Sequence, residues 1–210
     1  QAEASSAIPD SRIGRFFVRY YAPGIDPVLA MAEATPTRAH ILGVALFQDD
    51  HMAGRLNVDE TYLLVALAGK AHSRTQTLPV PGELARGKKK MSIRFTNVKA
   101  KPRLRIKAGV PEVAYELEFT GLLEDFQMGY PVTDKVLKEI ETSAAGSLTA
   151  MLETLWGKLV AANSDPLGLG NQVRARFNEY WLAHDWRKVY PAIEARFRVQ
   201  VDLLNYGVMR

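Results

Sequence analysis

The sequence contains no cysteine, so the fold cannot depend on a disulfide. Its 210 residues are enough to bury a hydrophobic core without one. No apolar run approaches the roughly 20 residues that a membrane-spanning helix needs, the longest being Tyr62 to Ala68. The first residues have neither the basic nor the apolar region of an export signal, and no initiating methionine precedes them. We expect a chain that neither spans a bilayer nor carries its own export signal, processed or cut from something longer.

Histidine is also scarce, and its four positions, 40, 51, 72 and 184, show no metal-binding spacing. Acidic residues adjoin histidine or each other at Asp49-Asp50-His51, Asp59-Glu60 and His184-Asp185. Consecutive residues in a tight turn point apart, Glu60 has a helix-capping explanation, and a histidine is favoured at a helix C-terminus. The sequence therefore predicts no catalytic residue and no metal site.

One stretch, Gly168-Leu169-Gly170, could be taken for a phosphate-binding loop, but it lacks the third glycine of the G-x-G-x-x-G pattern. Dinucleotide-binding loops follow a strand and carry that glycine, whereas this stretch follows a predicted helix and has Val173 in its place. The Walker lysine is absent as well. We predict a chain reversal between two helices and no cofactor.

Acidic residues are absent from Leu84 to Pro111, although the chain as a whole has a net charge of only +4. That segment contains ten basic residues: Arg86, Lys88, Lys89, Lys90, Arg94, Lys99, Lys101, Arg103, Arg105 and Lys107. Without these ten, 17 basic residues face 23 acidic ones, so the rest of the chain has a net charge of −6. The basic character is local.

Three interpretations of the basic segment stay open. It forms a solvated strand face partly neutralised by Glu116 and Glu118, it contacts anionic lipid or an acidic partner, or it binds nucleic acid. Nucleic-acid binders usually add exposed aromatic residues for stacking, and here Phe95 and Phe119 alternate onto the core face. The alternative function, a nucleic-acid-binding domain that uses Arg86 to Lys107, is therefore not the expected one. The candidate membrane or partner contacts are Lys88, Lys89, Lys90, Arg103, Arg105 and Lys107.

The N-terminal part predicts little regular structure. Residues 1 to 12 are small and polar and are typical of disorder, and the aromatic run Ile13 to Tyr21 predicts a short strand. Prolines then indicate a linker, and we place the edge of the compact domain between Ala30 and Arg38. The expected organisation is a tail, linker and short strand over residues 1–37 and an α+β domain over residues 38–210.

Within that domain the first elements are hairpins and a capped helix. Apolar runs predict strands from Ala39 to Phe47 and from Met52 to Leu56, and Asn57 with Glu60 predicts a capping box that opens a helix to about Ala71. A strand from Met91 to Val98 follows. A further hairpin pairs residues 103–108 with 113–119. Matching apolar to apolar positions there sets Arg105 opposite Glu116 and Arg103 opposite Glu118, with residues 109–112 as the loop.

The last third has the clearest periodicity. From the N-cap Thr133, apolar residues recur every three or four positions for about 30 residues, until Asn163, Pro166 and Gly168 end the helix. One further helix carries Val173, Phe177, Trp181 and His184 on one face, and Ile193 to Leu203 alternates as a half-buried strand. The three tryptophans fit packing positions, at 156, 181 and 186. The fold class is α+β, with a mostly antiparallel mixed sheet packed against one long and two shorter helices.

These segments together resemble the C-terminal domain of the Ger(x)C family, the lipoprotein C subunit of bacterial spore germinant receptors. Residues 41–47 and 52–56, followed by Glu60-Thr61, resemble its "G-x-A-x-F … G-x-L … E-T" opening, and Leu122-Leu123-Glu124 resembles a strand-ending glutamate. The ending "D-x-x-G-x-G … W … W … P … V-x-V … G" matches residues 165–170, Trp181, Trp186, Pro191, Val199, Val201 and Gly207. The resemblance extends from about Phe16 to Arg210.

The resemblance implies a non-enzymatic subunit needed for spore germination in response to nutrients. The parent protein would be lipid-anchored at the outer face of the spore inner membrane and would work with the integral-membrane A and B subunits of the receptor. This chain has neither the lipobox cysteine nor the family's N-terminal region. No residue-level active site follows from the resemblance. Combined with the basic segment, it predicts that the basic face orients the domain on an anionic membrane surface.

Overall fold

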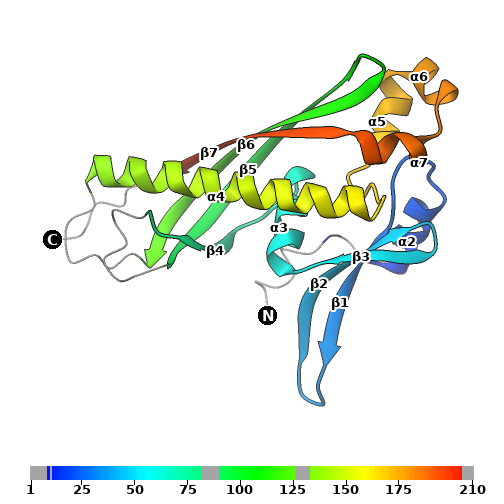
Figure 1. The fold of residues 1–210 in the computed structure, drawn as a ribbon. Helices are drawn as coiled ribbons and strands as arrows, with labels where there is room; N and C mark the ends of the chain where they lie inside the picture. Colours follow the sequence, from blue (N-terminus) through cyan, green and yellow to red (C-terminus); the bar gives the residue numbers. More distant parts are fainter. Residues whose placement is uncertain (1–8, 10, 82–89, 126–132, 205–210) are drawn as a thin grey trace.

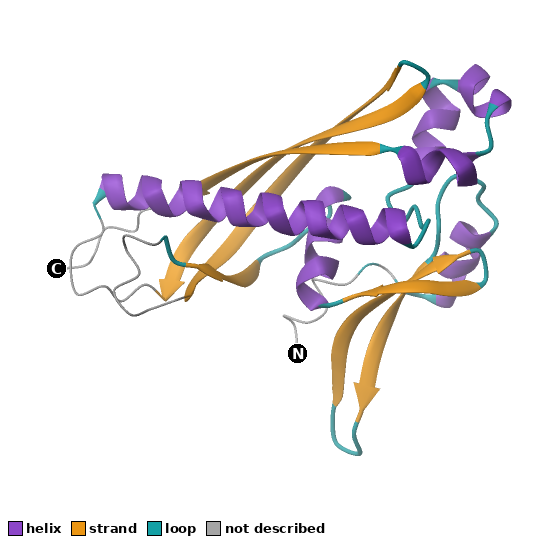
Figure 2. Cartoon of the chain, in the orientation of Figure 1, coloured by secondary structure: helices purple, strands orange, loops and turns teal. Residues whose placement is uncertain are grey.

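A computed structural model describes residues 9, 11–81, 90–125 and 133–204 (Figure 1). As predicted, the fold is α+β, with helices packed against sheet; the strands form two separate sheets instead of the single mixed sheet expected (Figure 2). The first sheet has the strand order β1-β2-β3 and the second the order β4-β5-β6-β7. Most of the predicted disordered tail, residues 1–8 and 10, lies outside the described residues.

The first sheet consists of β1 (Val28–Ala34), β2 (Ala39–Gln48) and β3 (His51–Leu56), all antiparallel. The β1–β2 hairpin projects from the body of the molecule, and the predicted domain edge lies within it (Figure 1). Helix α3 (Val58–Leu67) follows with the predicted capping box, in which the Asn57 side chain accepts from the Glu60 N–H and the Glu60 carboxylate accepts from the Asn57 N–H. The helix ends at Leu67, short of the predicted Ala71.

The predicted N-terminal strand is wrong, because Ile13–Tyr20 forms helix α2. The aromatic run has high strand propensity, but side chains four positions apart stack on the helix surface instead. Ring centroids lie 6.2 Å apart for Phe16 and Tyr20 and 6.3 Å apart for Phe17 and Tyr21. No residue of α2 is buried. The helix therefore lies on the surface of the molecule.

The second sheet consists of β4 (Arg74–Pro79), β5 (Lys90–Lys107), β6 (Val110–Asp125) and β7 (Glu194–Leu203). Strands β6 and β7 are parallel and the other pairs are antiparallel. The two strands predicted at 91–98 and 103–108 are one strand of 18 residues, with register shifts near Ser92 and between Phe95 and Asn97. Phe95 and Phe119 are fully buried in the core, as predicted.

The predicted hairpin register is wrong. Arg105 pairs with Glu112 and Arg103 with Ala114, because Ala108 and Gly109 alone form the turn. Both turn residues have positive φ, 47° and 79°, which suits the tight turns of two-residue hairpins. The actual register keeps apolar residues facing each other, with Leu104 opposite Val113. Hydrophobic matching requires only that the residue numbers of paired positions sum to an odd number. The length of the turn decides which odd sum, and therefore which register, is adopted.

Helix α4 (Asp134–Ala161) begins at the predicted N-cap, where the Thr133 hydroxyl accepts from the Val136 N–H. It lies along one face of the second sheet (Figure 1). Its inward residues Leu148, Leu152, Leu155 and Leu159 are fully buried. The one further helix predicted next is divided into α5 (Leu169–Arg176) and α6 (Asn178–Ala183). The break at Phe177, with φ −133° and ψ 55°, involves neither proline nor glycine, so no sequence signal marks it.

Helix α7 (Trp186–Val189) and the 3₁₀ turn η2 (Tyr190–Ala192) lead into β7, which alternates between outward and inward residues as predicted. Trp156 and Trp186 are buried and Trp181 is half-buried, in agreement with a packing role. The Trp156 indole N–H donates to the Ile193 carbonyl at 3.2 Å, which ties α4 to the start of β7.

Candidate interaction surface

The predicted contact residues on β5 lie along its outward face. The side chains of Arg103, Arg105 and Lys107 are 72%, 64% and 60% exposed, and Lys90 is exposed at the start of the strand. Lys88 and Lys89 lie outside the described residues. Lys99 and Lys101 continue the row, which we call the basic strand face: Lys99, Lys101, Arg103, Arg105 and Lys107. Strand β4 pairs only with the Lys90–Phe95 part of β5, so within the described chain the rest of β5 is a sheet edge lined by cations.

Glutamates of β6 face every member of the basic strand face. The Arg103 guanidinium lies 3.1 Å from the Glu116 carboxylate, and Arg105 lies 3.0 Å from that of Glu112. Lys107 also approaches Glu112, at 3.6 Å, while Lys99 and Lys101 share Glu118 at 3.8 and 3.4 Å. These pairs are the partial neutralisation considered from the sequence, although Glu112 was not anticipated as a partner.

The charge around Glu112 is the densest on this face. Desolvation opposes ionisation of its carboxyl, but the hydrogen bond from Arg105 and the charges of Lys107, Arg105 and Arg196 outweigh it and hold the pKa of Glu112 below its usual value. The carboxylate is therefore ionised under physiological conditions, and the basic strand face presents a mixed surface of cations and anions to any partner.

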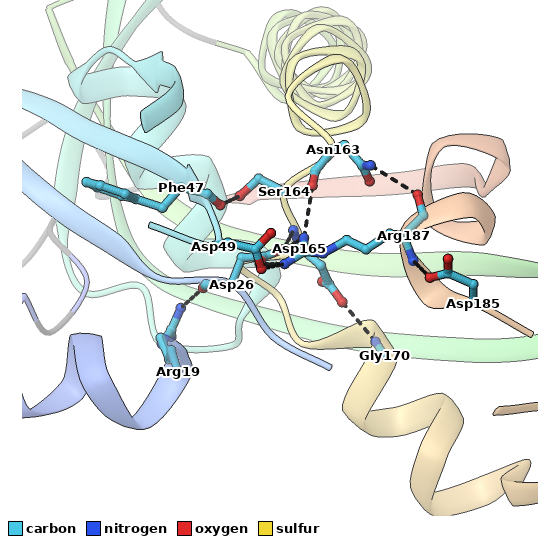
Figure 3. Close-up of polar contacts among 10 residues, drawn as sticks. All are labelled: Arg19, Asp26, Phe47, Asp49, Asn163, Ser164, Asp165, Gly170, Asp185 and Arg187. Carbon is cyan, nitrogen blue, oxygen red and sulfur yellow. Dashed lines mark hydrogen bonds and ion pairs between the residues drawn. The ribbon is translucent and has the colours of Figure 1, made fainter. Parts of the chain in front are cut away.

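A second, partly buried polar cluster lies where four segments of the chain meet (Figure 3). Its centre is the ion pair between Asp26, whose side chain is 5% exposed, and Arg187 of α7. The guanidinium donates to both carboxylate oxygens, at 2.7 and 2.9 Å, and also to Asp49 in the β2–β3 turn at 2.8 Å. The predicted solvated turn at Asp49 thus has one of its acids bound to Arg187.

Asp165, after the C-terminal end of α4, completes the cluster. Its two carboxylate oxygens accept from the Leu169 N–H at 3.0 Å and the Gly170 N–H at 2.8 Å. Its own backbone N–H donates to the Asp26 carboxylate at 2.6 Å, and its carbonyl accepts from the Asp26 N–H. Gly168 adopts the left-handed conformation, with φ 70°. The predicted chain reversal at Asp165 to Gly170 is confirmed.

Smaller contacts bind the cluster to its surroundings (Figure 3). The Ser164 hydroxyl donates to the Phe47 carbonyl, and Asn163 donates to the Arg187 carbonyl. Arg19 of α2 donates to the carbonyls of Asp26 and Pro166, at 3.3 and 3.1 Å. The cluster therefore fastens α2, the first sheet, the end of α4 and α7 together.

Burial is the largest influence on the Asp165 carboxyl and raises its pKa to about 7, against an ordinary value of 3.8. The hydrogen bonds from Gly170 and Leu169 stabilise the carboxylate and oppose that shift, while the negative charge of Asp26 adds to it. Asp165 is buried, as Asp26 is, and its raised pKa lies close to neutral pH.

Asp165→Asn is expected to flatten the pH dependence of stability between pH 4 and 7. Because the folded pKa is raised above the unfolded one, the folded protein binds the proton more readily, so Asp165 favours folding most below its unfolded pKa. That contribution falls as the pH rises, by at most about 1.4 kcal/mol per pH unit. Urea unfolding of the parent and the variant at several pH values measures the difference. Asp185→Asn, at an exposed helix cap, is the matched control, and equal pH profiles for the parent and Asp165→Asn would contradict the assignment.

Sequence reasoning missed the Asp26–Arg187 pair. Asp26-Pro27 was interpreted as part of a linker, and the two partners are 161 positions apart in sequence. Among the described residues no three histidine, cysteine or acidic side chains gather in a way that could hold a metal ion. No helix in the described ranges combines the length and apolar character needed to cross a membrane.

The sequence matches a known protein family over most of its length. The family described as "Spore germination B3/ GerAC like, C-terminal" matches residues 42–207. The chain belongs to this family. The match includes Gly43 of β2 and Gly54 of β3, the basic strand face and the Asp165 to Gly170 reversal, so these features lie in the family's C-terminal region.

A solved structure supports the same fold. The chain resembles the structure entitled "Crystal Structure of the GerBC protein" with a TM-score of 0.78 and 18% sequence identity. The similarity covers 96% of this chain and 66% of that one, so the chain spans about two thirds of the length of GerBC. No curated protein matches the chain.

Proposed function

We propose that the chain is a non-enzymatic, interaction-bearing part of a nutrient germinant receptor at the outer face of the spore inner membrane. Membership of the spore germination family over residues 42–207 carries the proposal. The partners would be the integral-membrane A and B subunits of such a receptor and an anionic membrane surface to which a lipid anchor holds the parent protein.

The two buried acids of the polar cluster are poor candidates for a general base, because internal hydrogen bonds occupy them. Both carboxylate oxygens of Asp165 accept backbone N–H groups, and both of Asp26 accept from Arg187. Acids occupied in this way stabilise a fold, whereas a general base must reach its substrate. The nucleic-acid alternative has no support from the family, and the aromatic residues of β5 and β6 that would stack on bases are buried.

Arg103, Arg105 and Lys107 of the basic strand face, together with Lys90 at the start of β5, stay the predicted contact with the anionic surface. Arg103, Arg105 and Lys107 are exposed but paired with glutamates, so we expect a shallow, salt-sensitive contact that orients the domain rather than a deep one.

Spores that lack the gene encoding this chain are expected to lose their response to at least one nutrient, with germination followed by the fall in optical density. They should still germinate with a trigger that bypasses the nutrient receptors. Restoring the gene with an affinity tag should restore the response and bring the A and B subunits down from detergent extracts. Unchanged nutrient germination together with no co-purified membrane subunit would contradict the proposal.

A further inference from the structure

Strand β7 forms one edge of the second sheet, with β6 on one side and no strand on the other within the described chain (Figure 1). It extends over ten residues, Glu194–Leu203, without proline, lysine or a register shift. Edge strands normally carry such features, because these features keep the unpaired backbone from joining another strand. The free edge of β5 has several of them, in its lysines and in Pro102. Strand β7 is therefore the unprotected edge of this sheet.

The backbone groups of alternate residues in β7 point to its free edge. In a strand, the N–H and C=O groups of one residue point to the same side, and successive residues alternate. The Leu204 N–H donates to β6, so even-numbered residues bond to that strand. On the free side, the Leu203 N–H donates to the Glu141 carboxylate at 2.9 Å, and the Ile193 carbonyl accepts from Trp156 at 3.2 Å. Odd-numbered residues therefore face the free edge, and side chains of α4 occupy it at both ends.

Four residues between these ends keep an open edge. Ala195, Phe197, Val199 and Val201 have edge-facing N–H and C=O groups for which the described chain offers no hydrogen-bond partner. The first three residues are only half-buried, and a groove of about 510 Å³ runs beside the strand, with α4 along one side. Backbone groups of this kind are hydrated until a further strand pairs with them.

The charges along β7 are complementary to those of the same strand turned around. On the face directed away from the core, Arg196, Arg198, Gln200 and Asp202 follow one another. Within the described residues Arg198 and Asp202 form no ion pair, and Arg196 has only two loose acidic partners, at 3.7 and 4.0 Å. Because the basic residues come first and the acid last, an antiparallel copy of the strand brings acid opposite base.

We infer that β7 pairs with β7 of a second copy of this chain, across a two-fold axis at Val199, and joins the two four-stranded sheets into one. Val199 then lies opposite Val199 of the second copy, and Phe197 lies opposite Val201. Each of these pairs exchanges both N–H···O bonds, because all their backbone groups face the free edge. The inference adds a partner to the proposed function and does not depend on the membrane location.

Charge and hydrogen bonding together select this register. The opposed pairs on the outward face are Arg196 with Asp202 and Arg198 with Gln200. A shift of two residues in one direction places Arg198 opposite itself, and like charges directly opposite each other are destabilising. A shift in the other direction pairs Phe197 with Leu203, whose N–H the Glu141 carboxylate already binds. The strand therefore fits its own copy best with Val199 at the axis.

Charge reversal tests the pairing in a way that a folding defect cannot imitate. Arg196→Asp and Asp202→Arg each place like charges opposite each other, so each is expected to raise the dimer dissociation constant about tenfold or more. An equimolar mixture of the two variants should return the constant to that of the parent. In the mixed dimer the new aspartate faces the new arginine, and the unchanged Asp202 of one chain faces the unchanged Arg196 of the other. Sedimentation equilibrium over a wide concentration range measures all of these constants.

Arg103→Asp is the matched control for the charge reversals. Arg103 lies on β5, two strands from the edge, and its side chain is 72% exposed, so this variant should associate like the parent. A parent chain that is monomeric at every concentration overturns the inference. A dimer that neither charge reversal weakens, or two weakened variants that stay monomeric when mixed, overturn it as well.

Val199→Pro distinguishes self-pairing from capture of a strand of another protein. The Val199 N–H faces the free edge, so proline removes no bond to β6, and the dimer should be lost while the fold is kept. If the parent chain is monomeric and Val199→Pro abolishes co-purification of the receptor's membrane subunits, the edge accepts a strand of a different protein and the self-pairing inference is wrong. That result would leave the proposed function intact, because germination of spores without the gene tests it separately.

Discussion

Arg187→Met is expected to lower the free energy of unfolding by about 3 kcal/mol, because removal of one partner leaves a buried charge uncompensated. The carboxylate left behind is that of Asp26, which is 5% exposed, and Asp49 loses the same partner. Urea denaturation followed by tryptophan fluorescence measures the change, since Trp186 lies next to the substituted residue.

The adjacent residue supplies the control. Lys188 is 84% exposed and pairs only loosely with Asp185, at 3.8 Å, so Lys188→Met should change stability by less than about 0.5 kcal/mol. In the double variant Asp26→Asn/Arg187→Met the two losses should not add, because each removes the same interaction. A cost below about 1 kcal/mol for Arg187→Met, or full additivity in the double variant, would show that the pair contributes little.

Gly43→Ala is expected to destabilise the fold by about 3 kcal/mol or more, or to prevent folding. Gly43 has φ +130°, and a Cβ at this position would lie 1.9 Å from the Leu56 carbonyl oxygen. The neighbour is backbone of the paired strand, so it cannot move aside without breaking the β2–β3 hairpin. The midpoint of thermal unfolding measures the effect, together with the yield of soluble protein.

Gly54 of the same hairpin offers a matched control. A Cβ there would meet the Ala162 Cβ at 3.4 Å and a Leu46 methyl at 3.5 Å, and its φ lies outside the strained range. Gly54→Ala should therefore cost less than about 1 kcal/mol. Equal effects of the two substitutions would mean that loss of glycine flexibility, rather than the contact with Leu56, decides the outcome at Gly43.

The features of the fold that follow local sequence patterns could be predicted from the sequence. The apolar repeat of α4, the capping box at Asn57 and the alternation of β7 each express a local rule that the structure obeys. The family resemblance could be predicted for the same reason, because its motifs fall at turns and helix ends such as Asp165 to Gly170. The residue types at these positions are restricted, because the backbone conformation of the turn admits few of them.

The errors arose where local patterns leave alternatives open. For the β5–β6 hairpin, several registers place apolar residues opposite each other, so the pattern does not single out one of them. The two-residue turn was not expected, because the left-handed conformation of Ala108 is unusual for alanine. The aromatic run of α2 has strand propensity, and its contact with Phe47 comes from a strand far along the chain.

The candidate site was only partly accessible to sequence reasoning. The cations of the basic strand face were found from their spacing, because outward residues alternate along a strand. The clustering of the exposed side chains Ile13, Phe17 and Tyr20 was missed, since they share one side only when Ile13 to Tyr20 is helical. The Asp26–Arg187 pair was missed because no local signal links residues so far apart.

That separation also sets an order of events during synthesis. Asp26 leaves the ribosome 161 residues before Arg187, a delay of roughly 8–30 s at typical bacterial and eukaryotic elongation rates. Strand β7, which completes the second sheet beside β6, emerges later still. Throughout this interval the Asp26 carboxylate lacks the Arg187 guanidinium that binds it in the folded protein. The native ion pair of the polar cluster therefore cannot form until α7 has been synthesised.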